Sequence, residues 1–360
     1  MKDKPVKACT IDAPCKINLH LKIGEKMGNG FHNLESLFAA LAFGDTLRLE
    51  CSENDGECCF SANWDSLPFM EPGREPFLSE GAAESDHLQV VKRGSPPGEN
   101  LIIRAVALFR EHTGYNCGLK IFLQKRIPLG AGLGGGSSNA ASSLLALNRL
   151  SGGALSMDEI KKMVISLGSD VPFFLSGGLA FASGRGELIE KVKFSRELWV
   201  VLVMPPFSSD TALAYKYLDD FREGNQAKKG KTLTKEALLH SLEEPPSSWP
   251  FQNDFLQLFL EYNQTDGDEW VLKAKTYRAI LEELKKHGAS FAGLSGSGSS
   301  CFGIFEKKSD AERAEIKLNE AGALLSECSK WGNSAQKRGI FTRLTFFLAR
   351  RADPVLQYST

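Results

Sequence analysis

The sequence predicts an α+β fold with two domains. The chain has 360 residues, which is enough to build two hydrophobic cores. Apolar and polar residues alternate at 119–124, as in a strand with one buried face, whereas residues 157–167 carry apolar side chains at helical spacing. Strand and helix patterns succeed one another along the chain. Composition and periodicity therefore support the class α+β with two domains, but they do not identify a particular fold within it.

The charge balance and the cysteine pattern limit the classes of partner. Lys and Arg number 43 against 44 Asp and Glu, so the net charge of −1 provides no bulk attraction for nucleic acid or an anionic membrane. The eight cysteines have no Cys-x-x-Cys spacing and are expected to be reduced thiols. Neither a signal-peptide pattern nor about 18 uninterrupted apolar residues occur in the sequence. We therefore expect a cytoplasmic protein that acts on a small molecule, with no nucleic-acid or membrane partner.

The first predicted strand covers residues 16–23. Apolar residues occupy positions 17, 19, 21 and 23, so Lys16 and Asn18 share the opposite face. On spacing alone, a half-exposed strand with ordinary polar side chains is the favoured interpretation. A further strand is expected to begin at the Gly-Asp-Thr segment of residues 44–46.

A glycine-rich stretch follows the strand at 119–124 and precedes a predicted helix. Five glycines stand at positions 130, 132, 134, 135 and 136, after Pro128. They give the backbone unusual freedom and let its amides approach a ligand closely. Ser137 and Ser138 then begin a helix-forming, partly apolar segment that extends to Leu150. A helix N-terminus at a glycine-lined loop predicts a phosphate site, because the unpaired amides and the helix dipole favour negative charge.

Other classes of glycine loop agree less well with the sequence. A Walker loop needs a lysine after its last glycine, and this stretch has none. Gly130, Gly132 and Gly135 satisfy the dinucleotide spacing, but that triplet is a weak signal, and the acidic residue expected about 20 positions later would fall at the start of a helical pattern. The segments His-Arg-Asp and Asp-Phe-Gly of protein kinases do not occur.

Three motifs resemble those of the GHMP superfamily of small-molecule kinases. The stretch from Pro128 to Ala141 resembles its second motif, residues 13–19 (Ala-Pro-Cys-Lys-Ile-Asn-Leu) its first and residues 293–305 its third. The resemblance implies the two-domain GHMP-kinase fold, with helices packed on mixed or antiparallel sheets and the active site in the cleft between the domains. We expect domains at 1–190 and 191–350, followed by a tail at 351–360.

The resemblance also implies two catalytic residues. Lys16 and Asn18 lie in the first motif, where the family has a lysine and an asparagine at the active site. Asp170 lies in Gly-Ser-Asp-Val-Pro-Phe-Phe, which is similar to the segment carrying the family's proposed catalytic base. From the residues alone Asp170 is a helix N-cap, with Pro172 in the first turn, and both roles are compatible. Lys16 and Asp170 are thus the expected catalytic residues, and Asn18 is expected to orient the substrate.

ATP and Mg²⁺ are the expected cofactors. The residues expected to bind ATP are Asn100, Lys125, Pro128, Gly130, Ala131, Gly132, Leu133, Gly134, Gly135, Gly136, Ser137, Ser138 and Asn139. Asn100 has two interpretations: it is the N-cap of a helix, or, by the resemblance, it lies near the adenine. We expect Mg²⁺ to bridge the phosphates, because no carboxylate cluster predicts a protein metal site.

One branch of the superfamily acts on an alcohol that carries cytidine diphosphate. Two segments of this sequence, around residues 31–32 and 209–216, resemble the segments with which that branch binds the base. The resemblance implies that Phe31 stacks on cytosine, that His32 hydrogen-bonds the edge of the base, and that Tyr215 covers its other face near Thr211. From the residues alone, Phe31 is a core aromatic, His32 a surface histidine and Tyr215 a ring packed on the core. Alternatives are a mevalonate, homoserine or sugar kinase, a dinucleotide-dependent oxidoreductase, or a catalytically silent nucleotide-binding module. We expect a monomer or weak homodimer.

Two segments are expected to be insertions. Residues 52–98 are irregular and rich in proline, and we expect a surface excursion or a rim of the cleft. Residues 221–250 are polar and include Lys228, Lys229 and Lys231, which are expected to lie in a solvated loop. The remaining predictions are a buried strand at 198–204, a helix at 309–325, a strand at 341–348, and a loop in 293–305 that folds back against the phosphate loop (residues 128–138).

Overall fold

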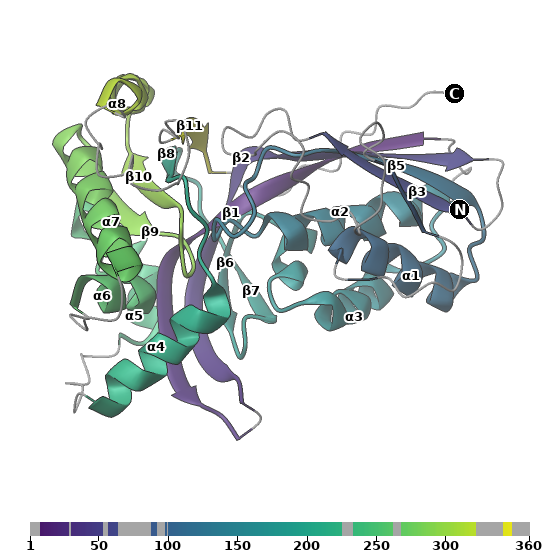
Figure 1. The fold of residues 1–360 in the computed structure, drawn as a ribbon, viewed down its shortest axis with the longest axis horizontal. Coiled ribbons are helices and arrows are strands. Elements are labelled where there is room, and N and C mark those ends of the chain that lie inside the picture. The colour runs from purple at the N-terminus through teal and green to yellow at the C-terminus, as the bar shows by residue number, and fades with distance from the viewer. Residues whose placement is uncertain are drawn as a thin grey trace.

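The strands of the protein form two sheets that a long hairpin connects (Figure 1). The computed structural model describes residues 8–28, 30–52, 57–63, 88–91, 98, 100–224, 233–261, 268–321 and 341–347. None of the helices in these ranges is long and apolar enough to cross a membrane. The described cysteines are free thiols, as expected.

The first sheet is mixed and contains seven strands. They are β1 (Ala8–Lys26), β2 (His32–Ser52), β3 (Cys58–Asn63), β4 (Leu88–Val91), β5 (Gly118–Gln124), β6 (Leu179–Ser183) and β7 (Leu188–Val192). The order is β4-β3-β5-β2-β6-β7, with β1 paired to β2, and only β3 and β5 run parallel. Three helices, α1 (Leu101–Thr113), α2 (Gly135–Leu150) and α3 (Met157–Leu167), cover one face (Figure 1). A short 3₁₀ helix, η1 (Val171–Leu175), follows α3.

The second sheet has four antiparallel strands in the order β11-β8-β10-β9. They are β8 (Trp199–Met204), β9 (Phe291–Leu294), β10 (Cys301–Phe305) and β11 (Phe341–Phe346). The associated helices are α4 (Thr211–Gly224), α5 (Lys235–Ser241), α6 (Asp254–Glu261), α7 (Asp268–Lys286) and α8 (Lys308–Ala321), together with the 3₁₀ turn η2 (Pro246–Ser248). The fold therefore has the mixed and antiparallel sheets that the family resemblance implied.

The β1–β2 hairpin belongs to both halves of the molecule. Near its turn, Leu21 forms a bridge with Asn253, and on β2 Leu41 forms a bridge with Phe347 beside the second sheet. Ile17 packs in one apolar cluster with Leu202 of β8 and other residues of the second sheet. Burying these residues on both sides is favourable by about 25 cal/mol per Å² of apolar surface. As a result, residues of β1 lie where the two sheets meet.

The sequence predicted a strand at 16–23 with an exposed polar face, and the predicted exposure is wrong. Lys16, Asn18 and His20 are all buried, at 4%, 3% and 2% exposure. The backbone of Lys16 donates to the Leu133 carbonyl, and an added Cβ on Gly134 would lie 3.1 Å from Lys16 Cγ, so the phosphate loop packs on the Lys16 side chain. Burial lowers the pKa of His20 to about 4, with Lys22 acting in the same direction, and its Nδ1 accepts from the Gln252 amide. Alternation alone cannot show that a second layer lies on the polar side.

Three other expectations need correction. The segment 52–98 is not wholly an excursion, because β3 and β4 add two strands to the first sheet. The segment 221–250 is not wholly loop, because α4 extends to Gly224 and α5 starts at Lys235, capped by Thr234. The Gly-Asp-Thr segment lies inside β2 rather than at the start of a strand. Lys228, Lys229 and Lys231 lie outside the described residues.

Other predicted elements are confirmed. Helix α3 has the predicted bounds, and its Ser156–Glu159 capping box fixes its start. Strands β8 and β11 and helix α8 agree with the predicted elements at 198–204, 341–348 and 309–325 as far as the structure describes them. Residues 322–325 and 348 lie outside the described residues. Strand β7, which ends at Val192, pairs in the first sheet, so that sheet extends just past the predicted boundary at 190. The division into domains stays a prediction, and the tail at 351–360 lies outside the described residues.

Candidate active site

The phosphate loop connects β5 to α2 and leaves the helix N-terminus open to a ligand. Gly134 is the N-cap of α2, with φ at +69°, and no side chain caps the helix start. Gly130 and Gly132 also have left-handed φ values, +62° and +73°. These angles suit glycine and strain other residues. The unpaired amides at the start of α2 thus remain available to an anion, as predicted for a phosphate site.

The 295–300 loop, between β9 and β10, lies directly against the phosphate loop. Ser295 Oγ donates to the Gly132 carbonyl at 2.9 Å, and the Ser300 amide donates to the Ala131 carbonyl at 3.0 Å. An added Cβ on Gly132 would lie 2.1 Å from the Ser295 carbonyl oxygen. The expected contact between these two loops is confirmed, and it joins the second sheet to the start of α2.

Lys16 is brought to the same place by β1. Its Nζ lies 2.5 Å from Asn18 Oδ1 and 3.4 Å from Asp170 Oδ2. The Lys16 side chain is 5% exposed, whereas the Asp170 side chain is 33% exposed. A buried ammonium therefore faces a carboxylate that a substrate can reach. The predicted catalytic residues, 154 positions apart in sequence, form one ion pair.

Asp170 occupies the N-cap position of η1, with Pro172 in the first turn, but its side chain makes no capping hydrogen bond. Asp170 therefore occupies the N-cap position that the residues alone predict. Its carboxylate points toward Lys16, as its expected role as a base requires. Tyr215 lies close enough to feel this charge: burial, together with Asp170, raises the pKa of Tyr215 to about 12. The phenol hydroxyl of Tyr215 is thus neutral at physiological pH.

Asn18 has a defined orientation because both ends of its amide are engaged. Its Nδ2 donates to Ser36 Oγ at 2.9 Å, and Ser36 Oγ donates in turn to the His20 carbonyl. Its Oδ1 accepts from Lys16. Asn18 thereby fixes the Lys16 ammonium through a second contact, in addition to Asp170.

Lys125, expected to bind ATP, makes buried contacts that support the phosphate loop. Its side chain is 3% exposed and its Nζ donates to Asp45 Oδ2 at 2.7 Å and to the Ile127 carbonyl. Burial lowers the pKa of Lys125, and Asp45 opposes this effect. Asp45 also accepts from the amides of Arg126 and Ile127 and from Asn139 Nδ2. These contacts place Lys125 to stabilise the loop, and the binding of ATP by Lys125 stays a prediction.

Replacing Asp45 should therefore destabilise the protein strongly. Asp45→Asn leaves the buried Lys125 ammonium without its counter-charge, and breaking a buried pair in this way costs about 3–5 kcal/mol. Glu50→Gln on the same strand is the matched control, because its 2.6 Å contact with Arg48 is partly exposed and contributes about 0–1 kcal/mol. Urea unfolding of both variants measures the difference. Equal losses in the two variants contradict the supporting role of Asp45.

Asn100 caps α1, since its side chain accepts from the Ile102 amide at 2.9 Å. The N-cap interpretation is confirmed, and the contact with adenine stays a prediction. Ser138 and Asn139 are buried in the first turn of α2. Ser138 Oγ has no hydrogen-bond partner within the described residues.

The residues expected to bind the base lie around the β1–β2 turn and α4. Phe31 is 53% exposed, and the Arg185 guanidinium lies 5.0 Å from the centre of its ring, so Phe31 is not a core aromatic. His32 is 8% exposed, which rules out a surface histidine. Its ring stacks on Tyr215, with centroids 5.0 Å apart and planes 19° apart. The pairing of Phe31 and Tyr215 across a base stays a prediction.

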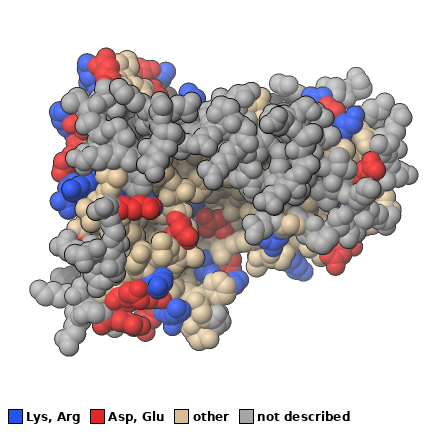
Figure 2. Space-filling view, viewed as in Figure 1, with Lys and Arg blue, Asp and Glu red and all other residues tan. Residues whose placement is uncertain are grey.

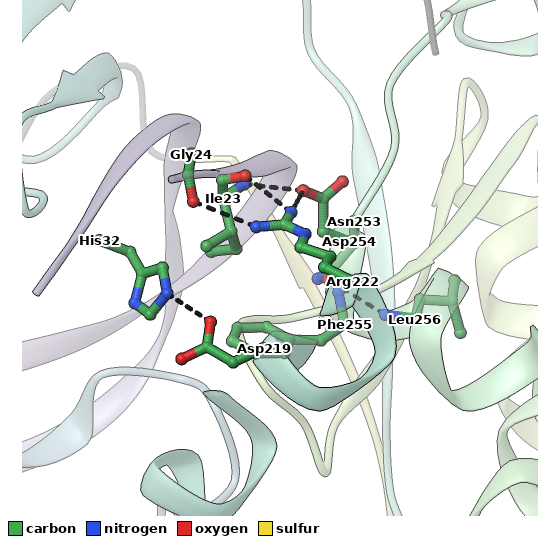
Figure 3. Close-up of polar contacts among 9 residues, drawn as sticks. All are labelled: Ile23, Gly24, His32, Asp219, Arg222, Asn253, Asp254, Phe255 and Leu256. Carbon is green, nitrogen blue, oxygen red and sulfur yellow. Dashed lines mark hydrogen bonds and ion pairs between the residues drawn. The ribbon is translucent and has the colours of Figure 1, made fainter. Parts of the chain in front are cut away.

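Thr211 and Asp219 belong to the same helix as Tyr215. Thr211 Oγ1 lies 2.8 Å from Ser297 Oγ, which connects the start of α4 to the 295–300 loop. Asp219 Oδ1 lies 2.7 Å from His32 Nε2, a contact that sequence reasoning missed (Figure 3). The available signal was an aspartate one helical turn after Tyr215, on the same face of α4.

The face of the molecule drawn in Figure 2 carries charged side chains of both signs. Figure 2 shows acidic and basic side chains interspersed across this face, without a broad patch of either sign among the described residues. This agrees with the net charge of −1. Any anion site therefore depends on local groups such as the α2 N-terminus and Lys16.

Comparison with known proteins agrees with this geometry. Residues 100–178 match the GHMP kinases N terminal domain, and residues 273–324 match the GHMP kinases C terminal family. The chain is 31% identical over 344 residues to the chloroplastic 4-diphosphocytidyl-2-C-methyl-D-erythritol kinase of Arabidopsis thaliana, covering 92% of this chain and 78% of that protein. It is 35% identical over 345 residues to the enzyme of the same name from Synechococcus sp. (strain CC9311), covering 91% of this chain and 97% of that protein.

Solved structures show the same relationship. A crystal structure of 4-(cytidine 5'-diphospho)-2C-methyl-D-erythritol kinase aligns with a TM-score of 0.65 at 27% identity, covering 94% of this chain and 98% of that chain. A homoserine kinase from Cytophaga hutchinsonii aligns with a TM-score of 0.59 at 15% identity, covering 98% of each chain, which shows a shared fold alone. With three GHMP motifs meeting at one site and relatives matched over most of their length, the chain belongs to the 4-diphosphocytidyl-2-C-methyl-D-erythritol kinase family of GHMP kinases.

Proposed function

We propose that this protein transfers the γ-phosphoryl group of ATP to the 2-hydroxyl of 4-diphosphocytidyl-2-C-methyl-D-erythritol, a step of the non-mevalonate isoprenoid pathway, giving the 2-phosphate and ADP. The observation that carries the proposal is the pair formed by buried Lys16 and accessible Asp170 beside the open N-terminus of α2. A phosphoryl transfer needs a base near an anion site, and this pair provides it.

In the proposed mechanism Asp170 accepts the proton of the attacking hydroxyl. Its carboxylate makes no capping bond and is partly exposed, so a substrate hydroxyl can approach it. Lys16, held by Asn18, orients the carboxylate. Its ammonium also compensates the negative charge of the phosphoryl group in the transition state. Asn18 orients the substrate through the same cluster of polar groups.

The amides of the phosphate loop would hold the triphosphate. Among the described residues no group of three or more His, Cys, Asp or Glu side chains is placed to hold a metal ion. Mg²⁺ would enter with the nucleotide and would supply neutralisation of the phosphate charge.

The base-binding residues distinguish this acceptor from other small alcohols. Phe31, His32 and Tyr215 gather aromatic and hydrogen-bonding groups between the β1–β2 turn and α4. Mevalonate, homoserine and sugars have no base to stack, so a kinase for one of these acceptors would have no ligand group for this cluster to bind. Stacking on such rings contributes about 1–3 kcal/mol per base.

The test is Mg·ATP consumption by the purified protein with one acceptor at a time. The panel contains 4-diphosphocytidyl-2-C-methyl-D-erythritol, mevalonate, homoserine and galactose. Turnover of the first compound alone is the expected result. Turnover of another acceptor keeps the kinase but rejects base binding by Phe31, His32 and Tyr215. Absence of turnover across the panel favours a nucleotide-binding module without catalysis.

A further inference from the structure

One carboxylate outside the catalytic pair contacts the residue expected to bind the base. Asp219 on α4 places Oδ1 2.7 Å from His32 Nε2 and Oδ2 3.0 Å from Lys26 Nζ (Figure 3). Partial burial raises the pKa of Asp219, but hydrogen bonds from Lys26 and His32 outweigh this effect and leave the pKa below its usual value. At neutral pH Asp219 is therefore ionised, and an ionised carboxylate only accepts hydrogen bonds.

This contact decides which nitrogen of His32 carries the proton. Because Asp219 accepts at Nε2, the ring donates from Nε2. In the neutral ring Nδ1 then carries a lone pair and acts as an acceptor. The contact thus assigns the acceptor of the neutral ring to Nδ1.

The helix that carries Asp219 is fastened to the hairpin that carries His32. Arg222, one turn further along α4, donates to the carbonyls of Ile23 at 2.8 Å and Gly24 at 3.1 Å and to Asp254 Oδ2 at 3.0 Å. Asp254 Oδ2 also accepts from the Ile23 amide at 2.8 Å. Figure 3 shows Arg222 reaching back to β1 while Asp219 faces His32. The distance between the carboxylate and the imidazole is therefore set by several bonds.

The orientation of the ring also suits a base in its plane. His32 and Tyr215 are stacked with their planes 19° apart. A base that hydrogen-bonds the edge of the imidazole lies near its plane and thus nearly parallel to the Tyr215 ring. Hydrogen bonding to His32 and stacking by an aromatic ring are then compatible in one pose.

We propose that Asp219 is a positioning residue that holds His32 in the tautomer with an acceptor at Nδ1, so that the site selects cytosine over uracil. Cytosine presents an exocyclic amine, which donates to Nδ1, whereas uracil presents a carbonyl oxygen at that position, which meets the Nδ1 lone pair. A site built to receive a donor rejects an analogue that lacks it, because its polar atom is left unpaired. This inference rests on the proposed function, because it needs His32 to face the base.

Equilibrium binding of cytidine 5'-diphosphate and uridine 5'-diphosphate, measured by calorimetry, tests the proposal. The wild-type protein should prefer the cytidine nucleotide, and Asp219→Asn should reduce the ratio of the two affinities about tenfold, since an amide can donate or accept at Nε2. Asp220→Asn is the matched control: it removes the same charge from an exposed neighbouring position of α4 and should leave the ratio unchanged.

Two further measurements separate positioning from a structural role. The ¹⁵N chemical shifts of the His32 ring should show the proton on Nε2 in the wild type and a mixture of tautomers in Asp219→Asn. His32→Asn places an amide that donates or accepts near the Nδ1 position, and it should also lose the preference, even if Asp219→Asn folds poorly. These results do not follow from a general loosening of α4, which would weaken both nucleotides equally.

The outcomes distinguish this proposal from the proposed function. A wild-type preference for the cytidine nucleotide that persists in Asp219→Asn overturns the role of Asp219 and leaves the function standing. Failure of the wild type to bind either nucleotide rejects the cytidyl substrate and, with it, base selection by His32. A wild type with the proton on Nδ1 overturns the tautomer assignment whatever the affinities are.

Discussion

Asp170→Asn should reduce turnover by about 10²–10⁴-fold while the affinity for ATP changes little. The amide keeps the size and position of the side chain but cannot accept the proton of the attacking hydroxyl. Because Asp170 makes no capping hydrogen bond in η1, the substitution removes no contact on which that helix start depends. Initial rates with 4-diphosphocytidyl-2-C-methyl-D-erythritol, together with nucleotide titration, measure the two effects separately.

Asp158→Asn is the control for this prediction. Asp158 lies at the start of α3, its side chain is 83% exposed and it pairs with Lys161 on the same helix. The substitution therefore removes one acidic charge without touching the Lys16 cluster, and its turnover should match the wild type. Near-normal turnover of Asp170→Asn would falsify the role of this residue as the base.

Gly132→Ala should disable the phosphate loop and lower the free energy of unfolding by about 3 kcal/mol or more. Its φ of +73° strains any residue with a Cβ, and the new Cβ would stand 2.1 Å from the Ser295 carbonyl and 2.7 Å from the Gly298 carbonyl. Both obstacles are backbone atoms, so no side chain can turn away to make room. The phosphate loop and the 295–300 loop must separate, and binding of ATP should weaken with them.

Gly114→Ala isolates the backbone strain from the collision. Gly114 ends α1 with φ at +67°, but nothing lies within 4 Å of the position that an added Cβ would occupy. This variant should lose only about 1–2 kcal/mol, the cost of the left-handed conformation, and should bind ATP normally. If urea unfolding gives the same loss for both variants, the close contact between the two loops does not control the stability of Gly132→Ala.

Where the information is local, the sequence predicted the structure well. The period of apolar residues at 157–167 placed α3, and the glycines before Ser137 placed the loop that leaves the start of α2 without a side-chain cap. The contact of the two glycine-rich loops joins residues 163 positions apart, and its prediction came from the family resemblance and not from a local pattern. Oligomeric state, cellular compartment and the domain boundary stay predictions.

One group of incorrect predictions concerned segments with weak periodicity. Prolines and acidic residues between 52 and 98 suggested an excursion, yet β3 pairs in parallel with β5. Such pairing depends on a partner more than fifty residues away, and short strands have little pattern of their own. The prediction for the polar face of β1 was wrong for a related reason, because distant segments pack on it: the phosphate loop lies against Lys16, and Phe251 and Gln252 lie against His20.

By itself the sequence determined the class of fold and the position of the phosphate loop. Through motif resemblance it also marked Lys16 and Asp170 as the candidate catalytic residues. Only the tertiary structure decided what these residues touch. Asp45 meets Lys125 across 80 positions, and Asp219 meets His32 across 187. Periodicity and turn chemistry act over a few residues, whereas such pairs form because packing of distant strands and helices leaves each buried charge needing a partner.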